Sequence, residues 1–157
     1  TIAWTGTVCS DPVMVSISVR PERYSYGLIR ETGEFVINLT TGELTYATDW
    51  CGVKSGRDVD KFAALELTAL PAETLAHAPL IAESPLSLEC RVKDVLELGS
   101  HHMFLAEVTA VQVSERFMSE NGKFELNGTG LVCYSHGEYF ELGRRIGKFG
   151  YSVKKRR

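Results

Sequence analysis

The stretch LSLECRVKDVLELGSHHMFLAEVTAVQV, residues 86–113, dominates the prediction of the fold. Its two halves, residues 86–98 and 103–113, alternate apolar and polar side chains with a period of two, which is typical of half-buried β-strands. Gly99-Ser100-His101 lies between them and predicts a hairpin turn. Long hairpins curl readily into a small closed barrel, which removes exposed strand edges. We therefore expect a mainly β fold built around this hairpin.

Shorter strand patterns lie on both sides of the hairpin. Residues 13–19 alternate apolar and small side chains, and Ser10-Asp11-Pro12 predicts a turn just before them. Strand-like runs are expected over residues 1–8, 13–19, 35–39, 131–134 and 139–142. The last two flank a second hairpin signal. With the long hairpin this gives about seven strands, without the βαβ alternation that a parallel sheet requires.

Two short helices interrupt the strands. Pro21-Glu22 precedes a helical pattern over residues 23–31, and Gly33 follows its end. A second helix is expected over residues 41–50, and a short helical turn ends near Leu65. Residues 69–85 show no periodicity and predict irregular structure.

Length and composition limit the class of protein. The chain has 157 residues, 44% of them hydrophobic, which fits one domain over residues 1–157. A reductase with separate dinucleotide and substrate domains would need about twice this length, at roughly 100–200 residues a domain. No apolar run approaches the ~20 residues of a membrane helix, so we expect a soluble protein that does not bind membranes. Because the chain begins at Thr1 inside a strand-like run, we also expect a preceding segment.

Charge is distributed unevenly along the chain. The net charge is −3, yet all 20 acidic residues and only 10 of the 17 basic residues lie in residues 1–141, which therefore carry −10. Residues 142–157 carry seven basic residues and no acid. A basic tail can bind nucleic acid or membrane phosphates. Because no aromatic-interleaved surface accompanies it, we favour a solvated tail, or one that docks on an acidic surface of its own or a partner subunit.

Cysteine spacing and known motifs exclude several chemistries. Cys9, Cys51, Cys90 and Cys133 lie about forty residues apart with no CxxC pair, which fits neither a zinc nor a haem site. Thiols in a reducing, cytoplasmic compartment are the better interpretation than disulfides. No dinucleotide-binding GxGxxG, P-loop, GxSxG or HExxH motif occurs. We therefore expect no metal and no Rossmann-type nucleotide site.

The best candidate for an anion site is Ser55-Gly56-Arg57 with Lys61. A glycine-containing loop that enters a helix exposes backbone N–H groups, and Arg57 and Lys61 lie one helical turn apart if the helix has begun. This arrangement suits one phosphate. The alternative is that these cations pair with Asp58 and Asp60 on a solvated turn. Chemistry alone leaves both interpretations open.

Aromatic and histidine residues carry weaker signals. Trp4 and Trp50 can stack on an aromatic ligand, although filling the core is the commoner role. His101 and His102 are adjacent, so in a strand they point to opposite faces and do not ligate one metal together.

A family resemblance adds to this interpretation. CGVKSGRDVDKF at residues 51–62, PERYSY at 21–26 and EFVIN at 34–38 are similar to the flavin reductase-like, flavoredoxin-type family of FMN-binding split barrels. Weaker matches follow at residues 85–90, 98–101, 106–108, 139–143 and 147–155. The twelve-residue block at 51–62 is the specific part, and the resemblance covers essentially the whole chain.

The resemblance implies both a fold and a cofactor. Each subunit of a homodimer would form a six-stranded antiparallel Greek-key split β-barrel with short helical excursions, holding FMN non-covalently near the interface. By position, the implied cofactor-binding residues are Ala3, Trp4, Thr5, Cys9, Ser10, Asp11, Ser55, Arg57 and Lys61. Residues 3–5 would run along the flavin and residues 9–11 would form a turn near its ring or phosphate. Lys61 would hydrogen-bond the cofactor and place positive charge beside the ring.

Two departures from the family pattern stand out. The family has about one more strand ahead of Thr1, which agrees with the expected preceding segment. The second departure is Cys9, which stands where serine is common. His101, in contrast, falls on the hairpin histidine of the family.

Three functions remain open at this point. The first is an FMN-dependent oxidoreductase that takes electrons from NAD(P)H and passes them to free flavin, a metal or a partner protein. The second is a flavoredoxin-type electron carrier that receives electrons from a protein and does not oxidise NAD(P)H directly. The third is a non-redox barrel whose basic tail binds nucleic acid or another protein. FMN would supply the redox chemistry, so the absence of catalytic motifs agrees with the first two functions, and we expect no nucleic-acid partner.

Overall fold

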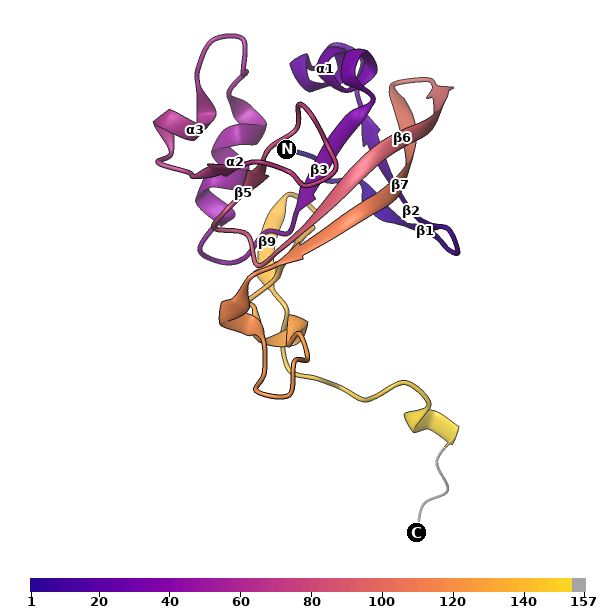
Figure 1. Cartoon of the computed structure of the whole chain (residues 1–157), viewed down its shortest axis with the longest axis vertical. Coiled ribbons are helices and arrows are strands. Elements are labelled where there is room, and N and C mark those ends of the chain that lie inside the picture. Colours follow the sequence, from indigo (N-terminus) through magenta and orange to yellow (C-terminus); the bar gives the residue numbers. More distant parts are fainter. Residues whose placement is uncertain (154–157) are drawn as a thin grey trace.

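A computed structural model of the chain describes residues 1–153 and is dominated by one antiparallel sheet (Figure 1). The sheet has five strands in the order β1-β2-β7-β6-β3. Their bounds are β1 (Thr5–Ser10), β2 (Val13–Val19), β3 (Glu34–Asn38), β6 (Leu86–Leu98) and β7 (His101–Val113). The mainly β, antiparallel class expected from the sequence is confirmed.

The β6–β7 hairpin is the longest element of the sheet. Its strands pair from Leu86 opposite Val113 to Leu98 opposite His101. Only Gly99 and Ser100 form the turn, so His101 begins β7 instead of lying in the turn as the sequence suggested. Irregular pairing at Glu89/Cys90 and Val92/Asp94 interrupts the register, and such bulges bend a strand and increase its twist.

The sheet is open across the described residues. β1 and β3 form its two edges, and no strand pairing joins them. The expected barrel of six strands is therefore not confirmed, and five strands are seen. β1 also begins at Thr5, so residues 1–4 lie outside the strand that was expected over residues 1–8.

Three α-helices lie beside the β3 side of the sheet (Figure 1). They are α1 (Tyr24–Thr32), α2 (Thr45–Val53) and α3 (Lys61–Ala64). α1 is close to its prediction and ends at Gly33, whose φ of 68° closes the helix through an N–H bond to Ile29 O. This left-handed conformation is one that glycine adopts without a steric cost.

α2 begins four residues later than expected. Thr41 is bridged to Leu131, and Gly42 N donates to Gly130 O at 3.0 Å. These contacts bind the segment before the helix to the chain before β8 (Val132–Ser135). At residues 41–44 this long-range pairing replaces the helix that the local sequence pattern favours.

Short elements complete the described chain. β4 (Ala69–Leu70) pairs with β5 (Leu80–Ile81) inside the segment expected to be irregular, and β8 pairs with β9 (Glu138–Glu141) as the second predicted hairpin. Three 3₁₀ turns lie at Glu115–Phe117, Leu126–Gly128 and Tyr151–Val153. None of the helices within residues 1–153 has the length and apolar character needed to cross a lipid bilayer.

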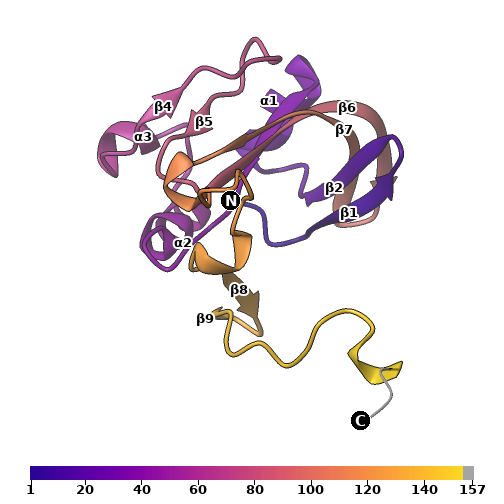
Figure 2. The same cartoon turned by 60° about the horizontal axis from the view of Figure 1, so that its bottom comes forward.

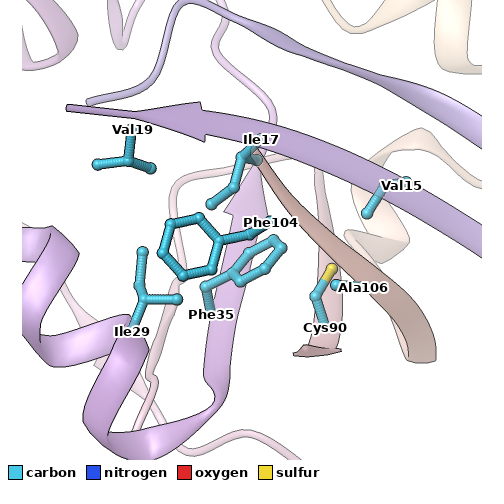
Figure 3. Close-up of a cluster of buried hydrophobic side chains, with 8 residues drawn as sticks. All are labelled: Val15, Ile17, Val19, Ile29, Phe35, Cys90, Phe104 and Ala106. Carbon is cyan, nitrogen blue, oxygen red and sulfur yellow. The ribbon is translucent and has the colours of Figure 1, made fainter. Parts of the chain in front are cut away.

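The core lies between the sheet and α1 (Figure 3). Phe104 of β7 is fully buried and packs with Phe35 of β3 and Ile29 of α1. The same cluster includes Val15, Ile17, Val19, Cys90 and Ala106. Because β2 places every second side chain on this face, the alternation at residues 13–19 is that of a half-buried strand. The core therefore fixes β3 and α1, which also form walls of the site described next.

The last described segment leaves the body of the molecule. After β9 the chain runs outward from the sheet as an extended arm over residues 142–153 (Figures 1 and 2). We call this segment the C-terminal arm.

Candidate functional site

Two adjoining cavities lie among α1, α2, α3 and β3. The first, of about 360 Å³, is lined by residues 22–25 and 51–57 and is called the basic cavity. The second, of about 560 Å³, lies against β3 and α1 and is called the apolar cavity. Both volumes fall in the range of about 300–1,000 Å³ that is typical of small-molecule sites. Thr1, Ile2, Ser25, Cys51 and Lys61 line both cavities, so one ligand can extend from one into the other.

The basic cavity gathers four cations around the beginning of α1. Arg23, Lys54, Arg57 and Lys61 line it, with the hydroxyls of Ser25 and Ser55. No side chain caps α1 at its N-terminus, so the first N–H groups of the helix add to the positive potential. The acid in the wall, Glu22, pairs with Arg20 at 2.7 Å. This set of donors is suited to an anion such as a phosphate.

The loop between α2 and α3 positions Arg57. Ser55 Oγ accepts a hydrogen bond from Arg57 N at 3.2 Å, and Ser55 O accepts from Asp58 N at 3.1 Å. The Arg57 guanidinium lies 5.5 Å from the centre of the Tyr24 ring, a cation–π contact with α1. A Cβ at Gly56 would approach this ring to 3.1 Å. Glycine at position 56 therefore lets the loop come close enough for Arg57 to stack.

Lys61 lies in the wall between the two cavities. Its Nζ donates to Cys51 O at 2.6 Å, which fixes the ammonium against the end of α2. Asp60 caps α3 by accepting from Phe62 N and Ala63 N at 3.0 and 3.1 Å. An ammonium has three N–H donors, and the bond to Cys51 uses one of them. Lys61 therefore retains donors for a ligand in either cavity.

The sequence suggested that Arg57 and Lys61 lie one helical turn apart if the helix has already begun at Arg57. α3 begins at Lys61, so Arg57 belongs to the preceding loop and the two cations do not share a helix face. The solvated-turn alternative is also contradicted, because Asp60 accepts from the backbone and no ion pair links Asp58 or Asp60 to either cation within the described residues. The fold nevertheless brings Ser55, Arg57 and Lys61 to one cavity.

The apolar cavity is formed mainly by hydrophobic side chains. Leu28 and Ile29 of α1 line it together with Phe35 and Ile37 of β3. Phe62, Leu67 and Ile81 contribute further apolar walls. A flat, weakly polar group fits such a lining better than a charged one.

Two buried carboxylates hold the segment over residues 73–77, which leads into the wall of the apolar cavity. Glu34 accepts from Ala76 N and His77 N at 3.0 and 2.9 Å. Glu89 is fully buried and accepts from Glu73 N, Thr74 N and Thr74 Oγ1 at 2.9, 2.7 and 2.7 Å. His77 and Pro79 then line the apolar cavity.

Hydrogen bonds decide the ionisation of both carboxylates. Burial alone would raise the pKa of Glu34, but the amides of His77 and Ala76 hold it below its ordinary value. Burial acts on the pKa of Glu89 in the same direction, and the donors of Glu73 and Thr74 again lower it. Both side chains are therefore carboxylates at neutral pH.

The other sequence-predicted residues lie at different distances from the cavities. Thr5 lines the apolar cavity and Ile2 lines both, so residues 3–5 lie next to them although Ala3 and Trp4 are not in the walls. Trp4 is 61% exposed and its ring stacks on His101 at 4.3 Å between centroids. The core placement favoured for Trp4 is therefore wrong.

The turn with Cys9, Ser10 and Asp11 lies at the far end of the β1–β2 hairpin (Figure 1). None of the three residues lines either cavity. Cys9 Sγ donates to Asp11 O at 3.4 Å, a contact within the turn. His102 faces away from His101 and contacts Tyr26 at 2.8 Å, which agrees with the expected alternation of the two histidines.

The sequence did not single out every residue of the basic cavity that suits an anion. Arg23, Ser25 and Lys54 line it beside the predicted set. Arg23 and Ser25 lie at the predicted beginning of a helix, and this position was itself a signal for anion binding. Lys54 directly precedes Ser55, but its contribution depends on where α2 ends.

Comparison with known proteins identifies the family of this chain. The family model for the Flavin reductase like domain matches residues 1–143. The chain belongs to the Flavin reductase like domain family. The resemblance that begins at residues 51–62 is thereby confirmed.

Relatives of this Flavin reductase like domain include a flavoredoxin and the reductase component of a monooxygenase. The flavoredoxin of Desulfovibrio vulgaris (Miyazaki F) superimposes with a TM-score of 0.88 and 31% identity, over 98% of this chain and 82% of the flavoredoxin. The reductase component of the 4-nitrophenol 4-monooxygenase/4-nitrocatechol 2-monooxygenase of Rhodococcus opacus is 31% identical over 71% of this chain and 56% of its own length.

A further relative matches more of the chain than the Rhodococcus opacus protein does, and it is named only as uncharacterized. An uncharacterized protein of Archaeoglobus fulgidus is 31% identical over 89% of this chain and 77% of its own length. The chain spans only about half of the Rhodococcus opacus reductase component.

Proposed function

We propose that this Flavin reductase like domain binds FMN and acts as an oxidoreductase, taking electrons from NAD(P)H or a protein donor and passing them to a flavin, metal or protein acceptor. The observation that carries the proposal is the junction of the basic cavity with the apolar cavity at Lys61. FMN has a phosphate at one end and a flat ring at the other. The two cavities match these ends in charge and polarity.

The residues present fit this group. Arg23, Ser25, Ser55 and Arg57 would hold the phosphate, since cations and hydroxyls are good phosphate donors. Ile37 and Phe62 would offer apolar contact to the ring, and Lys61 would donate to it from the shared wall. FMN supplies hydride and one-electron chemistry when bound, whereas the protein supplies binding, orientation and electrostatics.

The protein residues act through position and charge. Tyr24 holds the Arg57 guanidinium, so little side-chain freedom is lost when an anion binds. Cys51 O holds the Lys61 ammonium so that its remaining N–H groups are aimed before a ligand arrives. A fixed cation favours the more negative state of a neighbouring group, and Lys61 would raise the reduction potential of a flavin beside it.

The finer features implied by the family remain part of the proposal. Residues 3–5 would run along the ring, as Ile2 and Thr5 in the cavity walls support. The turn at Cys9, Ser10 and Asp11 lies away from both cavities of its own subunit, so we propose that it serves the site of a partner subunit. A homodimer with FMN near the interface would meet this requirement, and a sixth strand at the open edge of β1 would complete the split barrel.

We also propose one domain over residues 1–157 and a cytoplasmic location. Within residues 1–153, a core cluster that joins α1 to four strands of the sheet supports one domain. All four cysteines are free thiols, which is usual in a reducing compartment.

Ligand titration tests the phosphate end of the site. Arg57→Ala should weaken FMN binding by about tenfold to a hundredfold, the effect of losing one charged hydrogen bond. Riboflavin lacks the phosphate, so its affinity should not change. Lys93→Ala is the matched control, because Lys93 pairs with Glu107 outside both cavities. Equal losses for FMN and riboflavin would contradict the phosphate assignment.

A second titration tests Lys61. Lys61→Ala should weaken both FMN and riboflavin by about tenfold and lower the reduction potential of bound FMN. Absorbance spectra and a redox-dye titration measure the two quantities. Unchanged affinity and potential would refute the role of Lys61. A protein that stays colourless and takes up no FMN would refute the function itself.

The second candidate is an electron carrier of the flavoredoxin type. The similarity to the flavoredoxin of Desulfovibrio vulgaris (Miyazaki F) favours it. Anaerobic mixing of the FMN-loaded protein with NADH and with NADPH separates the two candidates. Rapid bleaching supports the NAD(P)H-dependent oxidoreductase, whereas no bleaching with either nucleotide supports the carrier.

A further inference from the structure

The His77 side chain is a polar group in the wall of the apolar cavity. His77 lines this cavity but not the basic cavity, and it is exposed, which places it at the mouth. Within residues 1–153, His77 is bonded through its backbone N–H and not through its ring. An imidazole has two nitrogens that donate or accept hydrogen bonds. Both are therefore available to a ligand in the apolar cavity.

His77 is carried by a loop over residues 71–79, which we call the strap. β4 and β5 pair at the two ends of the strap and close it at its base (Figure 2). Leu75, in the middle of the strap, is only 8% exposed. A compact loop with close ends and a buried side chain of its own is fixed to the surface beneath it. The strap is therefore a built wall of the site.

Glu34 fastens the strap on the side of the apolar cavity. Its side chain is buried and lines that cavity. One oxygen, Oε2, accepts from both Ala76 N and His77 N at 3.0 and 2.9 Å. Burial alone would raise the pKa of Glu34, but these two amides, and then the charge of His77, hold it low. The carboxylate of Glu34 therefore fixes the backbone that carries the imidazole.

The other end of the strap is held away from both cavities. Glu89 accepts from Glu73 N, Thr74 N and Thr74 Oγ1, and Arg91 Nη2 donates to Thr74 O at 2.9 Å. Neither Glu89 nor Arg91 lines a cavity. The two glutamates thus hold one strap at two places, and only Glu34 bonds to His77.

His77 and Lys61 lie at different places along the pair of cavities. Lys61 lines both cavities, whereas His77 lines the apolar cavity alone. A ligand whose phosphate lies in the basic cavity would therefore meet Lys61 at the junction and His77 farther from the phosphate. The ring of a flavin carries carbonyl oxygens and nitrogens at its edge, and these form hydrogen bonds with an imidazole.

We propose that His77 hydrogen-bonds the ring of a bound flavin and that Glu34 is the positioning residue for His77. The inference rests on the FMN site of the proposed function and deepens it by naming the groups that recognise the ring away from the phosphate. Because the backbone of His77 is fixed before a ligand arrives, less entropy is lost when the ring binds.

Titration with riboflavin, which has the ring and no phosphate, tests the contact of His77. His77→Leu keeps a similar size and removes both ring nitrogens. It should weaken riboflavin and FMN equally, by about threefold to tenfold, which is the effect of losing one neutral hydrogen bond. His77→Gln restores an N–H donor and should recover most of this affinity, and inorganic phosphate should bind all three chains equally. If His77→Leu binds riboflavin as tightly as the unmodified chain, the contact is overturned.

Two substitutions of Glu34 test the positioning role. Glutamine keeps one acceptor oxygen, and one oxygen accepts both bonds here, so Glu34→Gln should retain most of the riboflavin affinity. Methionine has a similar length but only a weak acceptor, so Glu34→Met should weaken riboflavin at least as much as His77→Leu. Hydrogen exchange at the amides of Ala76 and His77 should be faster in unliganded Glu34→Met only. Equal riboflavin affinity for the two Glu34 variants would overturn the positioning role.

A matched control and a double-mutant cycle separate positioning from stability. Glu89→Gln loosens the same strap outside the cavities, so it should lower stability and leave riboflavin affinity unchanged. Glu34→Met combined with His77→Leu should weaken riboflavin no more than the stronger single variant, because Glu34 acts through His77. Single effects that multiply in the double variant would overturn this coupling. His77→Leu changes an exposed side chain, so it tests the contact even if Glu34→Met does not fold.

The outcomes also separate this inference from the proposed function. An unmodified chain that binds neither FMN nor riboflavin refutes the function, and the inference falls with it. A chain that binds riboflavin equally in every His77 and Glu34 variant refutes the inference alone.

Discussion

Replacing Glu89 with glutamine removes one charge from the interior and tests how the segment at residues 73–77 is held. Glu89 is fully buried. One carboxylate oxygen accepts from Glu73 N, and the other accepts from both Thr74 N and Thr74 Oγ1. Glutamine has a single acceptor oxygen. One orientation of the amide therefore leaves Glu73 N, and Gln112 Nε2 that donates to the same oxygen at 3.5 Å, facing an NH₂ group. The other orientation leaves Thr74 N in that position, whereas the Thr74 hydroxyl can turn and accept from the NH₂ group.

The size of the effect follows from these donors. Leaving a buried donor without a partner costs about 1–3 kcal/mol. We expect Glu89→Gln to lower the free energy of unfolding by about 3 kcal/mol in total, because the charge that strengthens the remaining bonds is also lost. For a chain of this size, this corresponds to a fall in Tm of about 6–12 °C.

Urea unfolding at pH 7 measures the change, with Glu107→Gln as the matched control. Glu107 pairs with Lys93 at the surface, and exposed pairs contribute about 0–1 kcal/mol. The pKa of Glu89 is lowered by folding, so its charge stabilises the fold above the ordinary carboxyl pKa, and this gain is lost as pH falls through the lowered value. The difference between Glu89→Gln and the unmodified chain should therefore shrink in acid. If Glu89→Gln and Glu107→Gln have the same stability at pH 7, the anchoring role is wrong.

Two further predictions concern single residues. Gly33→Ala should lower the free energy of unfolding by about 1–2 kcal/mol, because Gly33 has a φ of 68° that alanine adopts poorly. Gly27 lies in open space within α1, so Gly27→Ala should instead raise the free energy of unfolding by up to about 1 kcal/mol. Thermal unfolding measures both variants, and equal effects would contradict this explanation. Burial raises the pKa of the Cys90 thiol to about 12, so Cys90 should resist a thiol reagent at pH 8 until the protein unfolds. Exposed Cys133 should react at once. Mass spectrometry of the labelled peptides measures both reactions, and rapid labelling of Cys90 in the folded protein would contradict the prediction.

The sequence predicted those parts of the fold that local patterns control. Residues 86–98 are a strand within their predicted bounds because the alternation and the turn at Gly99 act over neighbouring residues. The helix near residues 41–50 was displaced because Thr41 pairs with Leu131, ninety residues away. No local signal reports such a contact. The six-stranded barrel came from the family resemblance, and the described chain has five strands in an open sheet.

The candidate site was predicted where its residues are close in sequence. Ser55, Arg57 and Lys61 lie within seven residues and reach one cavity. The cation–π contact of Arg57 with Tyr24 and the bond of Lys61 to Cys51 depend on how α1, α2 and α3 pack, so the sequence did not predict them. Trp4 was misplaced because an exposed tryptophan stacked on histidine has the same local pattern as a buried one.

The bonds of Glu34 and Glu89 also bear on how this protein can evolve. Except for the bond from Thr74 Oγ1, they hold residues 73–77 through backbone N–H groups, which every residue except proline possesses. Apart from Thr74, side chains in this segment and beyond it, including His77 in the cavity wall, can therefore vary without loss of a bond to Glu34 or Glu89 from residues 73–77. Related chains that keep both glutamates can thus diversify the ligands they accept while retaining the same scaffold.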